Sequence, residues 1–401
     1  MRSTIRTCGL LATGLFVLTL AGCQSGGDTN HAKAVNAANV RWREMRTAMV
    51  LQMAQRQFDT GDLEQAEKSL TDALNTDPSN AGLYLLAGRI QIERGQLERA
   101  YQFLEVSIKY NPALAPAYYY QGMILERWQK FDQALDRYTQ AYQRRADDPA
   151  YLLARCEMLV ALDRLDDAEQ ELLDKMAYFD QNAGVRVGLA HVYLLQARPA
   201  DAADLFYKAS LMRPEDKQIV ENLAAAQLAA GQFDKAVITL QRMAQQPDFE
   251  KRADLQRALA GAYEHTGRPM DAKTIYLKLT RRDPSDVDAW QRLGTVCWAM
   301  GDLQGTQLAA SRIMALAPRQ YDGYLLAGLV AKKRGDVDQA LRVLDRAADL
   351  APDSALPLVL RGLTLEQAGR DAAAAQAYSE ALRRQPDDSQ ARQLLAKLES
   401  K

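Results

Sequence analysis

The sequence predicts an all-α protein, a solenoid of about ten repeated helix pairs closed by a C-terminal capping helix. Three observations predict it. The stretch GDLEQAEKSLTDALNTDP, from Gly61 to Pro78, returns in similar form as GQLERAYQFLEVSIKYNP from Gly95 to Pro112, an interval of 34 residues. Small residues, glycine and proline recur at fixed places within this interval. No run alternates β-branched and polar residues between turn signals, so no strand is expected.

Residues 1–22 are predicted to be a signal peptide. Two arginines make a short positive start, an apolar run follows from Leu10 to Leu20, and two small residues precede Cys23. This order is typical of a secretory signal. The apolar run is short for a bilayer span, which needs about 20 residues. A short membrane anchor that is retained is the alternative interpretation.

The segment Leu20-Ala21-Gly22-Cys23 resembles the lipobox of bacterial lipoproteins. The resemblance implies that the Cys23 thiol carries diacylglycerol, that a signal peptidase cuts before it, and that the new amino terminus is often acylated too. A thiol suits this chemistry because it is strongly nucleophilic near neutral pH. Two or three acyl chains hold a protein at a membrane far more firmly than one. Gln24, where inner-membrane lipoproteins carry Asp, implies the outer membrane, facing the periplasm.

Residues 23–38 are predicted to form a flexible tether. The segment is small and polar and has no apolar periodicity. A flexible chain of this length spans roughly 20 Å. The first helix is expected to begin at about residues 36–41, with residues 39–46 as its start, so that the array lies near the membrane and swings freely.

Ten units of 34 residues follow the tether. Position 20 of the unit is Ala in nine units and Thr306 in the other, and position 8 is always small. Small side chains allow two helices to pack closely. Gly at position 15 of seven units closes the first helix in the left-handed conformation, and Pro at position 32 of seven units ends the second. The register shifts once, by Lys251 and Arg252. The unit boundaries are 47–80, 81–114, 115–148, 149–182, 183–216, 217–250, 253–286, 287–320, 321–354 and 355–388.

This pattern resembles the tetratricopeptide repeat. The resemblance implies a right-handed superhelix in which each helix pair supplies the core of the next. Repeats three to five depart from the pattern at position 15, where they carry Gln129, Asp163 and Ala197. These repeats are expected to pack less regularly. Residues 389–401 are amphipathic and are predicted to be the helix that shields the last repeat.

The two cysteines of the array are predicted to be buried structural thiols. Cys156 fills the small position 8 of its unit, and Cys297 occupies position 11. Four units separate them, roughly 70 Å along the array at about 9 Å per helix. A disulfide needs Cα atoms within about 7 Å.

No catalytic motif stands out. The three histidines lie in separate segments, and the sequence contains no Walker-type loop, GxSxG, CxxC or HExxH. The protein is therefore predicted not to be an enzyme and to need no cofactor, metal or small-molecule substrate. The formal net charge of −1 offers no basic excess for nucleic acid.

The groove face is the set of positions 2, 5, 9, 12 and 13 in the first helix of each repeat, which the resemblance places along a concave surface. The family's carboxylate clamp uses Lys at position 5 and Asn at position 9. Neither occurs here, so no such clamp is expected. Apolar side chains with Arg and aromatics among them are typical of binding hot spots. The candidate groove residues are Leu85, Arg89, Tyr119, Met123, Leu153, His191, Arg257 and Trp298. The alternative for Tyr119 and Met123 is packing between neighbouring first helices.

These features predict a membrane-anchored scaffold that assists the assembly of a cell-envelope machine. It resembles in outline the lipoproteins that help assemble type IV pilus secretins, and cell-wall hydrolase adaptors. The alternative is an accessory lipoprotein of exopolysaccharide synthesis or export. The expected partners are envelope proteins, with an extended or helical segment lying along units two to five, and the lipid bilayer, through acylated Cys23.

Overall fold

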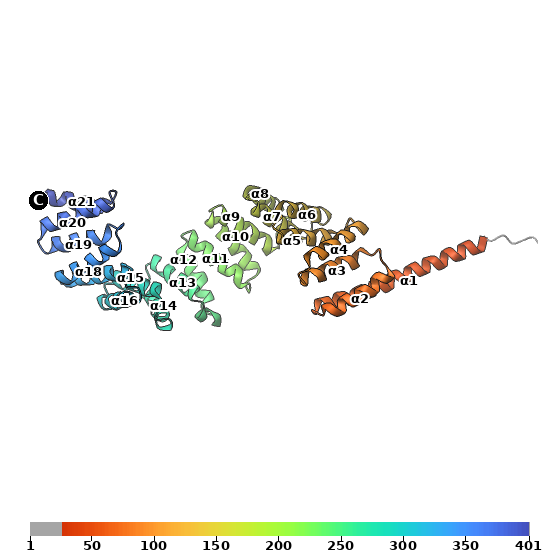
Figure 1. The fold of residues 1–401 in the computed structure, drawn as a ribbon, viewed down its shortest axis with the longest axis horizontal. Coiled ribbons are helices and arrows are strands. Elements are labelled where there is room, and N and C mark those ends of the chain that lie inside the picture. The colour runs from red at the N-terminus through yellow and green to blue at the C-terminus, as the bar shows by residue number, and fades with distance from the viewer. Residues whose placement is uncertain (1–25, 401) are drawn as a thin grey trace, which may run out of the picture. The chain divides into compact units, whose positions relative to one another are not determined.

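The computed structural model describes residues 26–400, so the predicted signal peptide and Cys23 lie outside the described residues. Within residues 26–400 the chain forms α-helices, one 3-10 helix and turns, and no strand (Figure 1). The predicted all-α repeat fold is thus confirmed. None of the described helices has the length and apolar character to cross a bilayer. The structure divides after Met158 into two compact parts, each described by itself.

The helices of the N-terminal part are α1 (Gly26–Asp59), α2 (Leu63–Thr76), α3 (Ala81–Glu93), α4 (Leu97–Tyr110), α5 (Ala115–Arg127) and α6 (Phe131–Arg144), with α7 (Pro149–Ala161) at the boundary. The C-terminal part contains α8 (Leu165–Met176), α9 (Ala183–Leu195), α10 (Pro199–Met212), α11 (Lys217–Ala229), α12 (Phe233–Met243), η1 (Pro247–Lys251), α13 (Ala253–His265), α14 (Pro269–Arg282), α15 (Val287–Ala299), α16 (Leu303–Leu316), α17 (Asp322–Arg334), α18 (Val337–Leu350), α19 (Leu356–Gln367), α20 (Asp371–Arg384) and α21 (Ser389–Glu399). Consecutive pairs, from α1 with α2 to α19 with α20, correspond to the ten predicted units.

Small residues at positions 8 and 20 let the two helices of a pair meet. Every Ala at position 20 is fully buried. At position 8, Gly122 leaves room for the ring of Tyr138: a Cβ added there would lie 2.6 Å from a ring carbon. Tyr138 is itself 1% exposed, so the ring has little space in which to retreat. The size of the position-8 side chain therefore sets how closely α5 and α6 approach.

Position 15 keeps its left-handed backbone even where glycine is missing. The seven glycines at this position have φ between 68° and 81°. Gln129, Asp163 and Ala197 adopt φ of 58°, 59° and 57°. The turn between the two helices is therefore regular in repeats three to five, while less regular packing of these repeats stays a prediction. The surrounding helix pair imposes the left-handed conformation, although it is sterically unfavourable for these three residues.

The segment predicted to be a flexible tether is helical. Helix α1 begins at Gly26. The prediction of a tether that extends to residue 38, with the first helix beginning at about residues 36–41, is therefore wrong. The segment has no proline, and after Gly27 no glycine interrupts it before Asp59. Alanine recurs through it, and alanine has the highest intrinsic helix propensity. Helix propensity therefore decides the conformation of this segment, although the segment has no apolar periodicity.

Helix α21 covers the last repeat, as predicted. Asp388 caps it by accepting a hydrogen bond from the Ala391 amide at 2.7 Å. Ala391 is fully buried, and Leu394, Leu395 and Leu398 pack against the core of α19 and α20. Elsewhere in the array, Cys156 is 3% exposed and Cys297 is fully buried, and the two form no disulfide. Both are buried thiols, as predicted.

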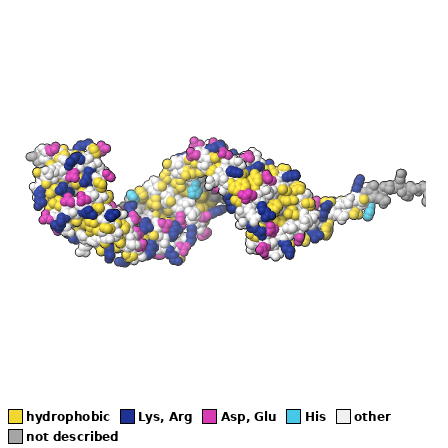
Figure 2. Space-filling view, viewed as in Figure 1, with side chains coloured by type: hydrophobic (Ala, Val, Ile, Leu, Met, Phe, Trp, Pro, Cys, Tyr) yellow, Lys and Arg dark blue, Asp and Glu magenta, His cyan; other side chains and the backbone are white. Residues whose placement is uncertain are grey.

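Basic and acidic side chains are interspersed on the face of the molecule shown in Figure 2. This mixing agrees with the 50 Lys and Arg and 51 Asp and Glu of the chain. Local ion pairs, such as Arg198 with Glu169 at 2.9 Å, link neighbouring helix pairs. Specific binding therefore has to come from local features rather than from net charge.

Candidate functional site

Two candidate groove residues, Leu85 and Arg89, lie in one pocket of the N-terminal part. The pocket is formed by α1 and α3 and has a volume of about 390 Å³. Its lining residues are Ala48, Leu51, Gln52, Gln55, Gly82, Leu85, Leu86 and Arg89. All except Gln52 and Leu86 occupy positions 2, 5 and 9 of the first helices of repeats one and two, so the pocket lies on the groove face. It can hold an apolar side chain of a partner next to a guanidinium.

Arg89, in repeat two, is held in place by neighbours from repeats one and three. Its guanidinium carbon lies 4.5 Å from the ring centre of Phe58 and 5.5 Å from that of Tyr120. Its Nη1 donates a hydrogen bond of 3.0 Å to Oε1 of Gln55. Cation–π contacts of this kind contribute about 0.5 to 1 kcal/mol at exposed sites. The N–H donors of the Arg89 guanidinium are therefore held in position before a partner binds.

Tyr119 and Met123 pack against one hydrophobic cluster with Leu125 and Tyr138. The ring of Tyr119 lies 5.5 Å from that of Tyr138 and 5.2 Å from that of Tyr151. Burial raises the pKa of the Tyr119 hydroxyl. The contact with Tyr151 is the one expected if Tyr119 packs between neighbouring first helices, and the contact with Tyr138 is within its own helix pair. Tyr119, Met123 and Leu153 nevertheless stay only half-buried, so each also presents part of its surface to solvent.

In the C-terminal part the candidate residues lie in three separate repeats. His191 is at the surface, with its ring edge-on to Phe206 at 5.2 Å. Arg257 forms ion pairs with Asp286, which caps α15, and with Asp288. Arg257 is thus engaged in linking α13 to α15. Trp298 is half-buried. The structure brings none of these three together.

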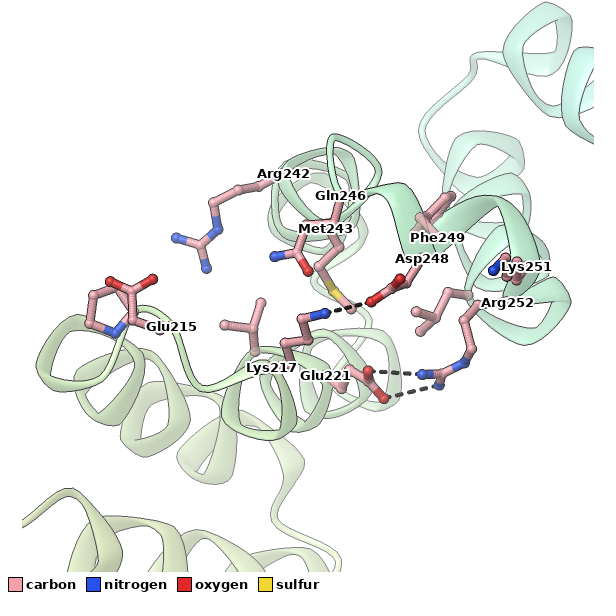
Figure 3. Close-up of a pocket in the computed structure, with 13 residues that line it drawn as sticks. Glu215, Lys217, Glu221, Arg242, Met243, Gln246, Asp248, Phe249, Lys251 and Arg252 are labelled. Carbon is pink, nitrogen blue, oxygen red and sulfur yellow. Dashed lines mark hydrogen bonds and ion pairs between the residues drawn. The ribbon is translucent and has the colours of Figure 1, made fainter.

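A second pocket forms where the repeat register shifts (Figure 3). Helix α12 ends at Met243, and η1 then carries the chain to α13. Phe249 of η1 is 6% exposed and, with Val220 and Met243, makes an apolar floor. The pocket has a volume of about 410 Å³. Its lining residues are Pro214, Glu215, Lys217, Val220, Glu221, Arg242, Met243, Gln246, Asp248, Phe249, Lys251, Arg252 and Leu255.

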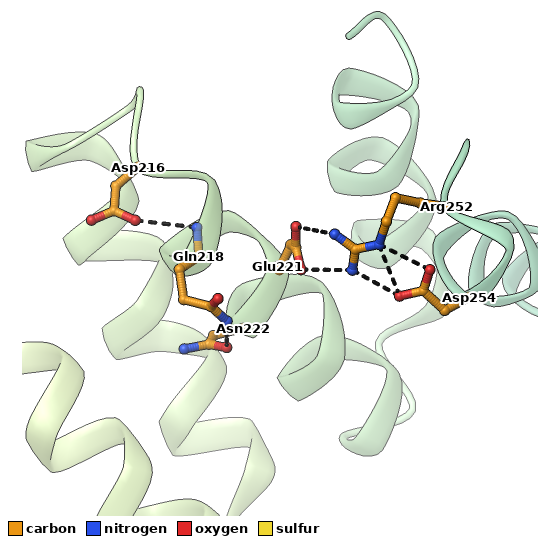
Figure 4. Close-up of polar contacts among 6 residues, drawn as sticks. All are labelled: Asp216, Gln218, Glu221, Asn222, Arg252 and Asp254. Carbon is orange, nitrogen blue, oxygen red and sulfur yellow. Dashed lines mark hydrogen bonds and ion pairs between the residues drawn. The ribbon is translucent and has the colours of Figure 1, made fainter. Parts of the chain in front are cut away.

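Ion pairs join the residues that line one side of this pocket. Arg252 donates two hydrogen bonds of 3.0 Å to the carboxylate of Glu221 and also binds Asp254 at 2.7 Å (Figure 4). Lys217 pairs with Asp248 at 2.6 Å. The Arg252 guanidinium lowers the pKa of the Asp254 carboxyl, and Lys217 lowers that of Asp248. Both carboxylates therefore stay charged well below neutral pH.

Arg242 lies away from these two pairs, on the side of the pocket where Glu215 lies (Figure 3). Within residues 26–400 it forms no ion pair. An apolar floor beside an uncompensated guanidinium suits a partner residue that is apolar, with a carboxylate next to it. None of the residues that line this pocket is among the candidate groove residues predicted from the sequence. Its signal was present in the two-residue shift at Lys251 and Arg252, since insertions in repeat arrays fall in loops on one face.

Family models of the tetratricopeptide repeat match residues 57–120, 187–251, 253–296 and 325–389. The chain is a tetratricopeptide repeat protein. As a tetratricopeptide protein it has a fold that typically serves as a non-catalytic scaffold for protein interaction. Within the described range, no three His, Cys, Asp or Glu side chains are placed to hold a metal ion.

Two curated relatives and one solved structure illustrate how this tetratricopeptide protein relates to others. It is 32% identical over 205 residues to the Cellulose synthase 2 operon protein C of Komagataeibacter xylinus, covering 48% of this chain and 15% of that protein. It is 23% identical over 325 residues to the BBSome complex member BBS4 homolog of Drosophila melanogaster, covering 77% and 66%. The chain thus spans less than two thirds of either relative. The C-terminal part of a TPR repeat-containing protein from Cytophaga hutchinsonii superposes with a TM-score of 0.48 at 16% identity, covering 61% of this chain and 99% of that one.

Proposed function

We propose that this protein is a membrane-anchored scaffold of the bacterial cell envelope that binds a segment of a partner protein on its groove face. The pocket between α1 and α3 carries the proposal. It combines an apolar lining with Arg89, which Phe58 and Tyr120 hold from two sides. Hot spots combine apolar anchors, aromatics and Arg in this way. The bound segment is extended or helical, and by holding it the scaffold assists the assembly of an envelope machine.

The anchor in this proposal is Cys23, acylated after removal of residues 1–22. The residues Leu20 to Cys23 and the preceding apolar run support it. Gln24 supports a final location in the outer membrane, facing the periplasm. Within the proposal, the membrane concentrates the scaffold and its partner on one surface, which raises their effective concentration.

Site-specific photocrosslinking tests the docking site. A photoreactive residue replaces Gln52 in the α1–α3 pocket, Gln246 in the η1 pocket or, as a control, Gln102 on the exposed side of α4. All three side chains are exposed, so each replacement is tolerated. We expect one defined envelope protein to crosslink at Gln52 and to be lost when Leu85→Ser is combined with Arg89→Gln. Equal crosslinking at Gln102, or crosslinks at Gln52 that survive the double variant, would refute the groove site.

A second candidate function is an accessory role in exopolysaccharide synthesis or export. The identity of 32% to the Cellulose synthase 2 operon protein C favours it. Deleting the gene that encodes this protein distinguishes the two candidate functions. Loss of secreted polysaccharide with intact pili and cell wall supports the second function, and the reverse supports the first. Crosslinking of a polysaccharide synthase or export subunit at Gln52 would join the scaffold mechanism to the second function.

A further inference from the structure

The first repeat exposes side chains at two positions that are buried in most later repeats. Positions 3 and 7 of the first helix pack toward the preceding helix pair, and Leu83, Leu223 and Leu293 at these positions are no more than 1% exposed. In repeat one the same positions are Met49, 71% exposed, and Met53, 47% exposed. Helix α21 covers the other end of the array. Terminal repeats normally present a polar outer face, so this apolar face requires a partner.

The apolar face continues along α1 beyond the repeat. Figure 1 shows the N-terminal half of α1 extending past α2 and α3 without a helix beside it, and residues 30–46 are all exposed. Val35, Trp42 and Met45 lie on the same side of this helix as Met49 and Met53, because steps of seven, three and four residues return to one face. We call these five residues the α1 stripe. Trp42 is 56% exposed and Met45 61% exposed.

The charges of α1 indicate what covers the stripe. Residues 30–46 carry Lys33, Arg41, Arg43 and Arg46 against Glu44, a net charge of +3 from four positive and one negative side chain. At 100° per residue, Arg41 and Arg46 flank the stripe on its two sides. A second copy would place these arginines against arginines, and like charges at the flanks oppose helix pairing. An anionic surface would instead attract them.

We propose that the α1 stripe lies in the headgroup region of an anionic lipid bilayer, with Arg41 and Arg46 contacting lipid phosphates. The orientation rests on the proposed acylation of Cys23, which would place the beginning of α1 three residues from the membrane. Trp and Met side chains with arginines beside them are suited to the headgroup region, where the apolar parts are buried and the guanidinium groups meet phosphates. The bilayer then covers the open end of the first repeat, and the anchor is a rigid helix on the membrane rather than a loose tether.

Vesicle binding of the unacylated chain tests this without the lipid anchor. The chain from Gln24 to Lys401 contains every residue that the structure describes and therefore every helix pair. Its flotation is measured with phosphatidylcholine vesicles, with and without roughly 30% phosphatidylglycerol, an anionic lipid. We expect binding to the anionic vesicles, and Trp42→Ser combined with Met45→Ser to lower the partition coefficient by about tenfold or more.

The matched control changes the other side of α1. Ala37→Ser combined with Val40→Ser also replaces two exposed apolar residues of this helix, outside the α1 stripe. We expect it to leave vesicle binding unchanged. Because residues 37–45 lie before the first buried residue, Thr47, neither double variant disturbs the core.

Three results would overturn the proposal. The first is an unacylated chain that binds neither vesicle, and the second is equal binding by the stripe and control variants. The third is a dimer, detected by light scattering, that the stripe variant converts to a monomer, which would assign the stripe to a second copy. An unmodified Cys23 with intact vesicle binding would instead refute only the proposed acylation.

Discussion

The left-handed residue at position 15 provides a direct test of how the repeats are built. Gly335, with φ of 79°, and Ala197, with φ of 57°, occupy this position in repeats nine and five. A Cβ added to Gly335 would meet no atom within 4 Å, so Gly335→Ala introduces backbone strain without a clash. Ala197→Gly removes the same strain from a surface position. The two substitutions are therefore opposite perturbations of one backbone conformation.

The expected magnitude follows from two opposing terms. An L-residue pays about 1 to 2 kcal/mol in the left-handed conformation, and glycine costs about 0.4 to 1 kcal/mol in unfolded-chain entropy. The difference is about 1 kcal/mol. Gly335→Ala is expected to destabilise the protein by this amount, and Ala197→Gly to stabilise it. Asp tolerates the left-handed region better than Ala does, so Asp163→Gly should stabilise less than Ala197→Gly.

Urea unfolding and amide hydrogen exchange measure these effects. Long repeat arrays often unfold in stages, so the local readout is needed. For Ala197→Gly, slower exchange is expected in α9 and α10, which flank the turn. For Gly335→Ala, faster exchange is expected in α17 and α18. If Gly335→Ala has no cost and Ala197→Gly no benefit, the position-15 turns do not have the left-handed geometry, and the account of the helix boundary fails.

Three further substitutions test packing and anchoring. Tyr119→Ala should destabilise the N-terminal part by about 2 kcal/mol because it removes ring contacts with Tyr138 and Tyr151. Tyr119→Phe keeps the ring and should be nearly neutral. Equal melting temperatures of the two variants would exclude a packing role for the ring. Gly122→Ala should lower the melting temperature, at a cost of about 1 to 3 kcal/mol from overpacking, while Gly261→Ala, whose added Cβ meets nothing, should raise it slightly. Cys23→Ala should release the protein from the membrane fraction, and mass spectrometry of the mature amino terminus should find Cys23 acylated in the parent chain; an unmodified terminus contradicts the anchor.

The sequence predicts the fold well because burial repeats with the same period as the residues. Each Ala at position 20 is fully buried, so a single rule covers nine positions. The cap after residue 388 follows from the same reasoning, since the last repeat must be covered. Cys156 and Cys297 follow as well, because their positions in the unit fix their burial. A pattern of burial that repeats every 34 residues therefore produces a residue pattern with the same period.

The candidate site is less predictable because a position facing the groove can be engaged in more than one way. Arg257 occupies a groove position, yet it forms ion pairs with Asp286 and Asp288 of the next repeat. Arg89 occupies an equivalent face and lines a pocket. The difference lies in which acids the following repeat presents, and this depends on side-chain geometry between repeats rather than on spacing within one.

Departures from the period are therefore the places at which to look for function. In a strictly regular array every helix pair presents a similar surface, and nothing distinguishes one docking position from another. The shift at Lys251 and Arg252 breaks this equivalence: η1 inserts Phe249 into the core, and a pocket opens in which Arg242 has no acidic partner among the described residues. The extension of α1 breaks the equivalence of the repeats at the N-terminal end of the array, where Met49 and Met53 lack the helix pair that covers their counterparts. Each departure exposes an apolar surface beside arginine, the combination that a regular repeat hides, so these positions are where partners can be distinguished.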